Sequence, residues 1–360
     1  MSQVTSKNTM LAEAWNELLH ERPNLRIRDA AKELGVSEAE LLATKIGTDV
    51  IRLQGPWPDL LVGFKTLGRV MSLTRNDSCI LEHKGSFQKI DVMGSGNHAM
   101  ATVVGPIELR VFFAAWHLAF AVTDKKADRV LRSIQVFDKA GDAIIKVYLQ
   151  EGSKEDAYEK IIADFRAADQ RTPLEVTPWT KETLDVDVNK DALLEEWGAL
   201  KDTHDFFGMI RKHKVSRLHA VELANGAFTF PIDAQVAPQQ ILEEAAASKL
   251  PIMVFAGNRG NIQIHQGKVR TIRVLERGSQ KWLNVLDPDF NMHLLMDDVH
   301  SGWVVKKPTT EGDVTSVELF DVDGNLIAQF FGLRKPGIPE REAWRELINN
   351  LGHQPITSDL

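Results

Sequence analysis

The sequence contains one pattern twice, and an internal repeat restricts the possible folds more than any local propensity does. Residues 73–85 (LTRNDSCILEHKG) align with residues 255–267 (FAGNRGNIQIHQG), so that Asn, Ile, His and Gly recur in register. Residues 134–141 (IQVFDKAG) match residues 317–324 (VELFDVDG), and both contain a Phe-Asp-x-x-Gly segment typical of a turn. The chain therefore consists of two copies of one folding unit.

Both copies show the same succession of periodic segments. Apolar residues with helical spacing come first, alternating apolar and polar residues follow, and a second helical pattern ends the copy. These segments are residues 11–19, 107–113 and 157–165 in the first copy and residues 193–200, 317–327 and 343–351 in the second. We predict an α+β fold made by tandem duplication, in which each repeat has N-terminal helices, an antiparallel β-sheet and a closing helix.

A segment of different composition joins the repeats. Residues 170–189 are rich in Pro, Thr and charged side chains, which is typical of a linker. We therefore expect an N-terminal repeat at residues 1–169 and a C-terminal repeat at residues 190–360. The length agrees with two domains, since a domain takes about 150 residues.

The composition excludes several classes of protein. Cys79 is the only cysteine, so the chain has neither an internal disulfide nor a Cys-x-x-Cys metal site. No apolar run reaches the roughly 18 residues of a membrane span, and the polar start lacks the apolar core of a signal peptide. We therefore expect a cytoplasmic protein that does not insert into membranes. A net charge of -7 opposes general attraction to nucleic acid.

The eleven histidines do not support a zinc hydrolase, because the sequence has no His-Glu-x-x-His pair. His83 and His265 occupy equivalent strand positions in the two copies. Such a repeated position indicates a structural role for both side chains.

His204 differs from the other histidines because it stands at a predicted helix start, with Asp202 or Thr203 as the N-cap. The helix dipole there favours the neutral imidazole that a metal requires. Gly208 follows one helical turn later and would leave room for a flat macrocycle beside Phe207. Spacing alone favours a surface histidine above a packing glycine, so the metal-ligand interpretation stays open at this point.

Two groups of cations are candidates for binding an anion. Arg110 lies in the alternating segment 107–113, on the face that also carries Glu108. A solvated arginine paired with an acid on a neighbouring strand is the commoner explanation, and a ligand contact is the alternative. Lys306-Lys307 and Arg334-Lys335 form the second group, which would bind two carboxylates or simply coat a surface.

Two motifs suggest other functions. Residues 94–99 (GSGNHA) fit the dinucleotide pattern G-x-G-x-x-A, but strand-like segments flank them, so we interpret them as a hairpin turn. Residues 26–42 resemble a helix-turn-helix whose second helix would begin Ser37-Glu-Ala-Glu40. Acids at the base-facing end of that helix would repel DNA. We interpret this segment as a structural helix pair and keep a DNA-binding regulator as the alternative function.

Several sequence blocks together resemble the HemS/HmuS/ChuS family of cytoplasmic haem-utilisation proteins over nearly the whole chain. They are Thr203-His204-Asp-Phe-Phe207 and residues 29–41, 109–112, 255–260, 307–309, 316–320 and 327–329. The resemblance implies one haem b between the two halves, with His204 as the axial ligand of its iron and Arg110 as the distal residue. It implies pocket or propionate-side positions at Phe207, Arg217, Lys307, Gln329, Phe331 and Arg334. At position 331 some relatives have tyrosine, so this chain lacks a hydroxyl there.

The resemblance also implies a function in haem uptake and iron acquisition. Proteins of this kind carry haem intact or degrade it oxidatively to release iron, and the residues agree with both. In an enzyme of the haem oxygenase kind, Arg110 would be the catalytic residue, since its N–H donors would orient an iron-bound oxygen species. The implied partners are haem itself, an inner-membrane haem transporter and a haem oxygenase that receives the haem.

Overall fold

The computed structural model describes residues 2–125, 128–171, 174–180, 183–334 and 338–351. These residues belong to two compact units. The first unit comprises Met1–Arg75, Glu82–Thr180 and Asn258–Gln263, and the second comprises Asn76–Leu81, Lys181–Gly257 and Ile264–Leu360. Each unit thus includes one short segment from the other half of the sequence.

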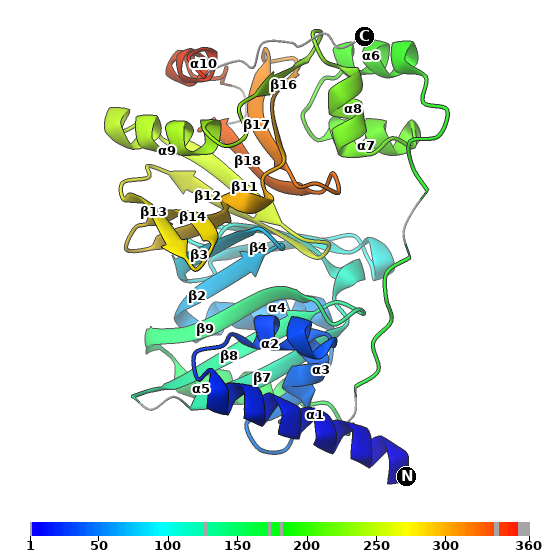
Figure 1. The fold of residues 1–360 in the computed structure, drawn as a ribbon, viewed down its shortest axis with the longest axis vertical. Helices are drawn as coiled ribbons and strands as arrows, with labels where there is room; N and C mark the ends of the chain where they lie inside the picture. Colours follow the sequence, from blue (N-terminus) through cyan, green and yellow to red (C-terminus); the bar gives the residue numbers. More distant parts are fainter. Residues whose placement is uncertain (1, 126–127, 172–173, 181–182, 335–337, 352–360) are drawn as a thin grey trace. The chain divides into compact units, whose positions relative to one another are not determined.

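The first unit contains an antiparallel sheet in the order β1-β7-β8-β9-β2 (Figure 1). These strands are β1 (Val50–Leu53), β7 (Leu118–Lys125), β8 (Val130–Phe137), β9 (Ala143–Ser153) and β2 (Gly68–Arg75). Further antiparallel pairs join β4 (Lys89–Met93), β5 (Met100–Val104), β6 (Leu109–Phe112) and the start of β12 (Asn261–Gly267) in sequence. The helices are α1 (Ser2–Glu21), α2 (Ile27–Leu34), α3 (Glu38–Ala43), α4 (Trp57–Gly63) and α5 (Glu155–Phe165), with short 3-10 turns at Phe64–Leu67, Gly96–His98 and Phe113–Ala115.

The second unit repeats this design with a sheet in the order β10-β16-β17-β18-β11. These strands are β10 (Thr229–Ile232), β16 (Ser301–Lys307), β17 (Val314–Phe320), β18 (Leu326–Gly332) and β11 (Ile252–Gly257). Strands β13 (Ile272–Arg277), β14 (Gln280–Leu286) and β15 (Phe290–Leu295) form antiparallel pairs, a 3-10 turn follows at Met296–Asp298, and β3 (Cys79–Gly85) begins in this unit. The helices are α6 (Lys190–Gly198), α7 (Asp205–Lys212), α8 (Arg217–Leu223), α9 (Ala237–Ser248) and α10 (Glu342–Asn349).

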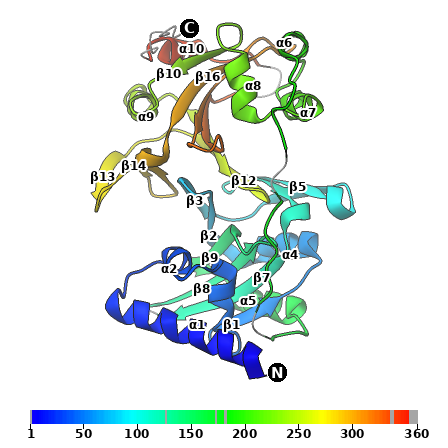
Figure 2. The same ribbon diagram turned by 45° about the vertical axis from the view of Figure 1, so that its right-hand side comes forward.

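The large sheet of the second unit carries helices on both faces. Figure 2 shows α9 and α10 on one side and α6, α7 and α8 on the other. On the first side, Val304 and Phe330 share one buried apolar cluster with Trp344 of α10. On the second side, Val305 packs with Trp197 of α6. Because neighbouring residues of a strand face opposite sides, each strand of this sheet supplies two different apolar surfaces.

The predicted duplication is confirmed, since the two large sheets have the same strand order and the same kinds of helices around them. The repeated Phe-Asp-x-x-Gly segments form equivalent turns. Asp138 accepts backbone hydrogen bonds from Ala140 and Asp142, and Asp321 accepts them from residues 323 and 325. Gly141 and Gly324 have φ of 84° and 79°, a left-handed conformation that explains glycine at these positions.

The helix pair α2–α3 is built into the first unit rather than presented for DNA. Five of the six residues of α3 are buried, including Glu38, and Ala39 and Leu42 pack with Phe120 of the sheet. Ser37 and Glu40 form a capping box at the helix start. The acids of this segment therefore serve the helix and the core, which agrees with the structural interpretation and opposes the alternative of a DNA-binding regulator.

Two smaller predictions also concern the fold. Residues 94–99 connect the antiparallel strands β4 and β5, as a hairpin connection should, and a 3-10 turn rather than a long helix follows Gly94. Across the part of the chain that the structure describes, no helix is both long and apolar enough to cross a membrane.

Candidate functional site

His204 lies at the start of α7 with its ring in solvent, since its side chain is 90% exposed. Asp202 accepts a hydrogen bond of 2.8 Å from the His204 backbone N–H, and its Oδ1 lies 2.6 Å from His204 Nδ1. When Nδ1–H donates to this carboxylate, the lone pair of the neutral imidazole is on Nε2. The backbone hydrogen bond, followed by the ring contact, keeps the pKa of Asp202 below its usual value. An exposed imidazole held in this way is a suitable axial ligand for a metal.

The helix start differs from the prediction in one respect. The N-cap residue is His204 itself, not Asp202 or Thr203. The Asp205 N–H already bonds to the Asp202 carbonyl at 3.1 Å, which makes a turn ahead of the helix. The Asp202 carboxylate instead accepts a hydrogen bond from the His204 backbone N–H. It therefore orients the histidine and does not cap the helix.

Helix α7 separates an apolar face from an open one. Phe206, Met209 and Ile210 are buried, and the Phe206 ring lies edge-on to Trp197 with centroids 4.7 Å apart. On the open face Phe207 is 60% exposed, and a Cβ added at Gly208 would have no atom of the described residues within 4 Å. The open space beside Gly208 agrees with the predicted room for a flat ligand.

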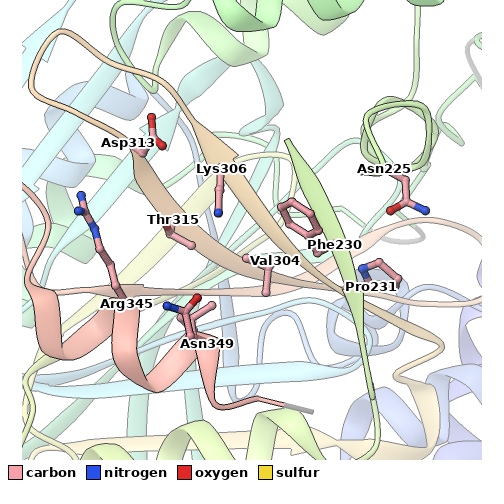
Figure 3. Close-up of a pocket in the computed structure, with 10 residues that line it drawn as sticks. Asn225, Phe230, Pro231, Val304, Lys306, Asp313, Thr315, Arg345 and Asn349 are labelled. Atoms are coloured by element: carbon pink, nitrogen blue, oxygen red, sulfur yellow. The ribbon is translucent and has the colours of Figure 1, made fainter. Parts of the chain in front are cut away.

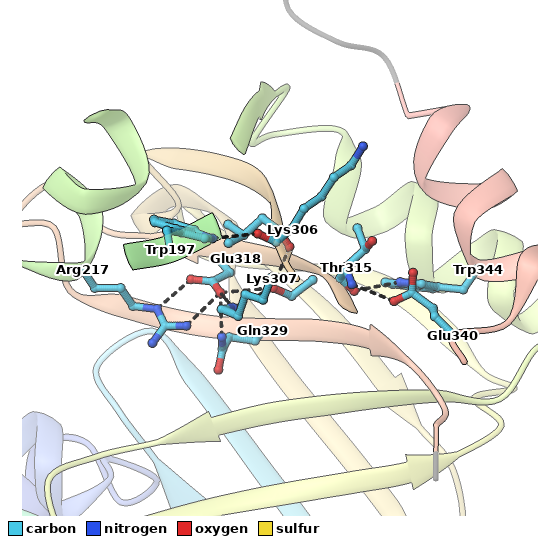
Figure 4. Close-up of polar contacts among 11 residues, drawn as sticks. Trp197, Arg217, Lys306, Lys307, Thr315, Glu318, Gln329, Glu340 and Trp344 are labelled. Carbon is cyan, nitrogen blue, oxygen red and sulfur yellow. Dashed lines mark hydrogen bonds and ion pairs between the residues drawn. The ribbon is translucent and has the colours of Figure 1, made fainter. Parts of the chain in front are cut away.

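The buried carboxylate of Glu318 binds two cations of this unit, Arg217 and Lys307 (Figure 4). Arg217 Nε and Nη2 donate to its two oxygens at 2.7 and 2.8 Å, and Lys307 Nζ donates at 2.8 Å. Ser316 Oγ and Gln329 Nε2 donate at 3.1 and 2.9 Å. These side chains come from α8, β16, β17 and β18, because Glu318 is paired with Gln329 across the sheet and shares its face with Lys307.

Burial and charge act against each other in this cluster. Burial opposes ionisation of Glu318, but Arg217 and Lys307 together outweigh it and hold the pKa of Glu318 well below its usual range. For Lys307, burial and the repulsion of Arg217 lower the pKa despite the attraction of Glu318. The cluster has two cations and one anion, so its formal charge is positive and it is suited to a further carboxylate.

Phe206 connects the cation cluster to the His204 helix. Its ring centroid lies 5.0 Å from Arg217 Cζ and 4.8 Å from Lys307 Nζ, both cation–π distances. On the same unit, the Phe331 ring lies edge-on to Phe255 with centroids 5.0 Å apart. On one face of the second unit, aromatic rings thus lie next to the buried Lys307 and the half-buried Arg217.

Arg334 belongs to the surroundings of the His204 turn. Its Nη2 lies 3.2 Å from Oε2 of Glu311, and its positive charge is among the causes that lower the pKa of Asp202. The neighbouring Thr310 N–H donates to the Lys201 carbonyl at 3.1 Å, which attaches this loop to the segment before His204. Lys335, the neighbour of Arg334 in the predicted cation group, lies outside the described residues.

Seven of the eight predicted ligand-binding residues belong to the second unit: His204, Phe207, Arg217, Lys307, Gln329, Phe331 and Arg334. The eighth, Arg110, belongs to the first unit. It lies on β6 between the buried residues Leu109 and Val111, and its Nη2 is 3.1 Å from Glu108 Oε1. Leu109 and Val111 are buried as the predicted alternation requires, whereas Glu108, the acidic partner of the arginine, is also buried and lies just before the strand begins.

Glu318 and Phe206 were missed by reasoning from the sequence. All seven residues of β17 (VTSVELF) are buried, and Glu318 is the one charged residue among them. An acid within such an apolar strand must be paired, and this was the available signal. Phe206 is a phenylalanine in an apolar run, and nothing in the sequence separates it from ordinary core residues.

A pocket of about 420 Å³ lies on the other face of the sheet, next to α10 (Figure 3). Lys306 lines it, whereas Lys307 faces the Glu318 cluster, so strand alternation separates the two lysines that the sequence grouped. The other lining residues are Asn225, Phe230, Pro231, Val304, Asp313, Thr315, Arg345, Ile348 and Asn349. None of the eight predicted residues lines this pocket.

His83 and His265 are both buried within their units. Gln263 Nε2 lies 3.0 Å from His83 Nδ1, and burial lowers the pKa of His83 to about 4. The His265 ring stacks on Phe290 with centroids 3.7 Å apart. These contacts agree with the structural role predicted from their repeated positions.

The model of the Haemin-degrading HemS.ChuX domain matches this chain twice, at residues 35–165 and 214–351. The chain belongs to this family. Hemin transport protein HmuS of Yersinia pestis is 32% identical over 354 residues, which cover 98% of this chain and 100% of HmuS. The structure of holo-PhuS, a heme-binding protein from Pseudomonas aeruginosa, is similar with a TM-score of 0.91 and 44% identity, covering 96% of this chain and 99% of PhuS. The structure of ChuS, an E. coli heme oxygenase, has a TM-score of 0.84 and 32% identity and covers 95% of this chain and 99% of ChuS.

Proposed function

We propose that this member of the HemS family binds one haem b and carries it in haem uptake and iron acquisition in the cytoplasm. The observation that supports this most is the His204 turn. A solvent-exposed imidazole has its Nδ1 held by Asp202, on a helix that packs through Phe206 against two cations, the half-buried Arg217 and the buried Lys307. Few other ligands use an imidazole nitrogen, apolar rings and carboxylate-binding cations together.

Each residue of the second unit has a distinct part in this proposal. His204 Nε2 binds the iron, and Asp202 orients the ring. Phe207 and the open surface of Gly208 accept one flat side of the macrocycle. Arg217, Lys307, Gln329 and Arg334 bind propionates through N–H donors, and the Phe331 ring adds an apolar contact.

Arg110 is proposed as the second functional arginine, in the first unit. Its guanidinium offers several N–H donors to an oxygen ligand. Glu108 holds it at 3.1 Å, which keeps the side chain in a defined direction. In a haem-degrading reaction this donor would make Arg110 the catalytic residue.

Degradation of haem is the second candidate function, favoured by the similarity to the heme oxygenase ChuS. A carrier passes haem intact to an oxygenase after receiving it from an inner-membrane transporter, whereas an enzyme opens the ring. Both functions need the same His204 site. They differ in what happens when reductant and oxygen are added.

The experiment is therefore hemin titration followed by reduction in air. A Soret band that saturates at one haem per chain supports haem binding, and its absence with folded protein refutes it. Catalase is included, because free peroxide bleaches haem without catalysis. A stable complex that transfers haem to apomyoglobin supports the carrier, and loss of the band with a defined tetrapyrrole product supports the enzyme.

A further inference from the structure

Glu318 has several hydrogen-bond donors before any ligand arrives. It accepts five hydrogen bonds, two from Arg217 and one each from Lys307, Ser316 and Gln329. Four of these bonds end on Oε1 and one, from Arg217 Nε, ends on Oε2, so donors already engage both oxygens of the carboxylate. The same contacts occupy N–H donors of the two cations that the proposed function assigns to propionates.

The equivalent positions of the first repeat have the opposite charge. Arg217 is equivalent to Glu38, because each is the first residue of its helix after an N-cap serine. The cross-strand pair Glu318 and Gln329 is equivalent to the pair Gln135 and Lys146, counted from the matching turns. Glu38 forms a buried ion pair with Lys146. The fold thus keeps a buried ion pair here in both copies, with the charges exchanged between elements.

Lys307 completes the reversal. Its equivalent in the first repeat is Asp124. The pair β16–β17 has the same register as the pair β7–β8 when both are counted from the Phe of the Phe-Asp-x-x-Gly turn. The four positions therefore have one net positive charge in the second repeat and one net negative charge in the first. By this charge, the second repeat is suited to an anionic ligand at these positions and the first is not. In the second repeat an anionic ligand and the Glu318 carboxylate would bind the same two cations.

We propose that Glu318 is an internal competitor for Arg217 and Lys307, and that this competition sets how fast the protein releases a ligand with carboxylates. The inference rests on the proposed haem function. A propionate that approaches the cluster must share the positive charges of Arg217 and Lys307 with Glu318, so its attraction to these cations competes with theirs to Glu318. The protein thereby holds haem through His204 while its hold on the propionates stays weak enough for transfer.

The direct test is Glu318→Gln, measured as the rate of haem transfer to excess apomyoglobin. This variant removes the anion that Arg217 binds in the parent protein. The positive charge of Arg217 is then available to a propionate, even if Lys307 becomes neutral. We expect release about tenfold slower, since a hydrogen bond to a charged group is worth at least that factor. Glu318→Asp keeps the charge and is the matched control, with release close to the parent rate.

A ligand without carboxylates separates this effect from a general distortion. Iron protoporphyrin dimethyl ester retains the iron and the ring but has no propionate charge. Its release from Glu318→Gln should equal its release from the parent protein. Equal slowing of haem and of the ester would contradict the inference, and so would haem release from Glu318→Gln at or above the parent rate.

A second pair of variants covers the case in which Glu318→Gln does not fold. Lys307→Met removes one cation, and Lys307→Met with Glu318→Gln removes one charge of each sign and leaves Arg217 alone. The double variant should release haem more slowly than the single one, and an equal or faster rate would refute the competition. If the parent protein gives no Soret band with hemin, the proposed function itself is refuted. If the band is present but the release rates differ from those expected, only this inference is refuted.

Discussion

Replacing Asp202 by asparagine tests how this chain prepares His204 for iron. The carboxylate is the partner of His204 Nδ1 at 2.6 Å, and it also accepts the His204 backbone N–H. Removing the partner of a metal-bound histidine typically costs 10- to 100-fold in affinity. Here the ring is 90% exposed and the Asp202 side chain 62% exposed, so solvent screens the pair. We therefore expect the lower end, a loss of about tenfold in hemin affinity.

The assay is hemin titration at neutral pH, followed by the Soret band. The matched control is Asp205→Asn, the same chemical change three residues along the chain. Asp205 accepts the Asp202 backbone N–H at 3.2 Å and has no contact with the imidazole among the described residues. Unchanged affinity in Asp202→Asn, or an equal loss in Asp205→Asn, would refute the proposed role of the carboxylate.

Three further predictions concern stability and catalysis. Gly141→Ala combines a φ of 84° with a Cβ that would collide with the Ser37 side chain, so it should lower the free energy of unfolding by about 2 kcal/mol, measured in urea. Gly226→Ala, at a φ of 81° in open space, should cost less, and an equal cost would contradict the collision. Burial lowers the pKa of His83 from 6.5 to about 4, so its neutral form stabilises the fold fully above pH 6.5, and up to about 3 kcal/mol is lost as the pH falls towards 4. His83→Gln should flatten this pH dependence, and an unchanged slope would show that another group causes it. If the protein degrades haem, Arg110→Ala should slow degradation by about 100- to 1000-fold while hemin still binds His204, whereas a parent-like rate would leave Arg110 only its ion pair with Glu108.

The duplicated fold was predictable because its signals are local. Helical and alternating periodicities identify the elements, and the Asp and Gly of each Phe-Asp-x-x-Gly turn are required by hydrogen bonds and a positive φ within a few residues. The arrangement of the sheets follows from these elements once the repeat is recognised. The reciprocal exchange of short segments between the units was not predictable, since no residue pattern marks Asn76–Leu81 as part of the second unit.

The polar part of the site was only partly predictable, because its contacts join distant segments. Apart from Ser316, the donors to Glu318 are the distant residues 217, 307 and 329, so neither the acid nor these partners show this role from their neighbours in sequence. The cation group Lys306-Lys307 was wrongly treated as one patch, although strand alternation alone places the two side chains on opposite faces. The N-cap was predicted at Asp202 or Thr203, since the turn that directs Asp202 to His204 depends on backbone geometry.

The most direct test of the central claim is the spectrum of the ferric haem complex of His204→Ala. His219→Ala is the matched control, since His219 lies on the adjacent helix α8 and its Nδ1 is 3.7 Å from Glu222. We expect His204→Ala to shift the Soret band and weaken hemin binding at least tenfold, and added imidazole to restore the spectrum, whereas His219→Ala should match the parent protein. A parent-like spectrum and affinity in His204→Ala would contradict the assignment of His204 as the iron ligand.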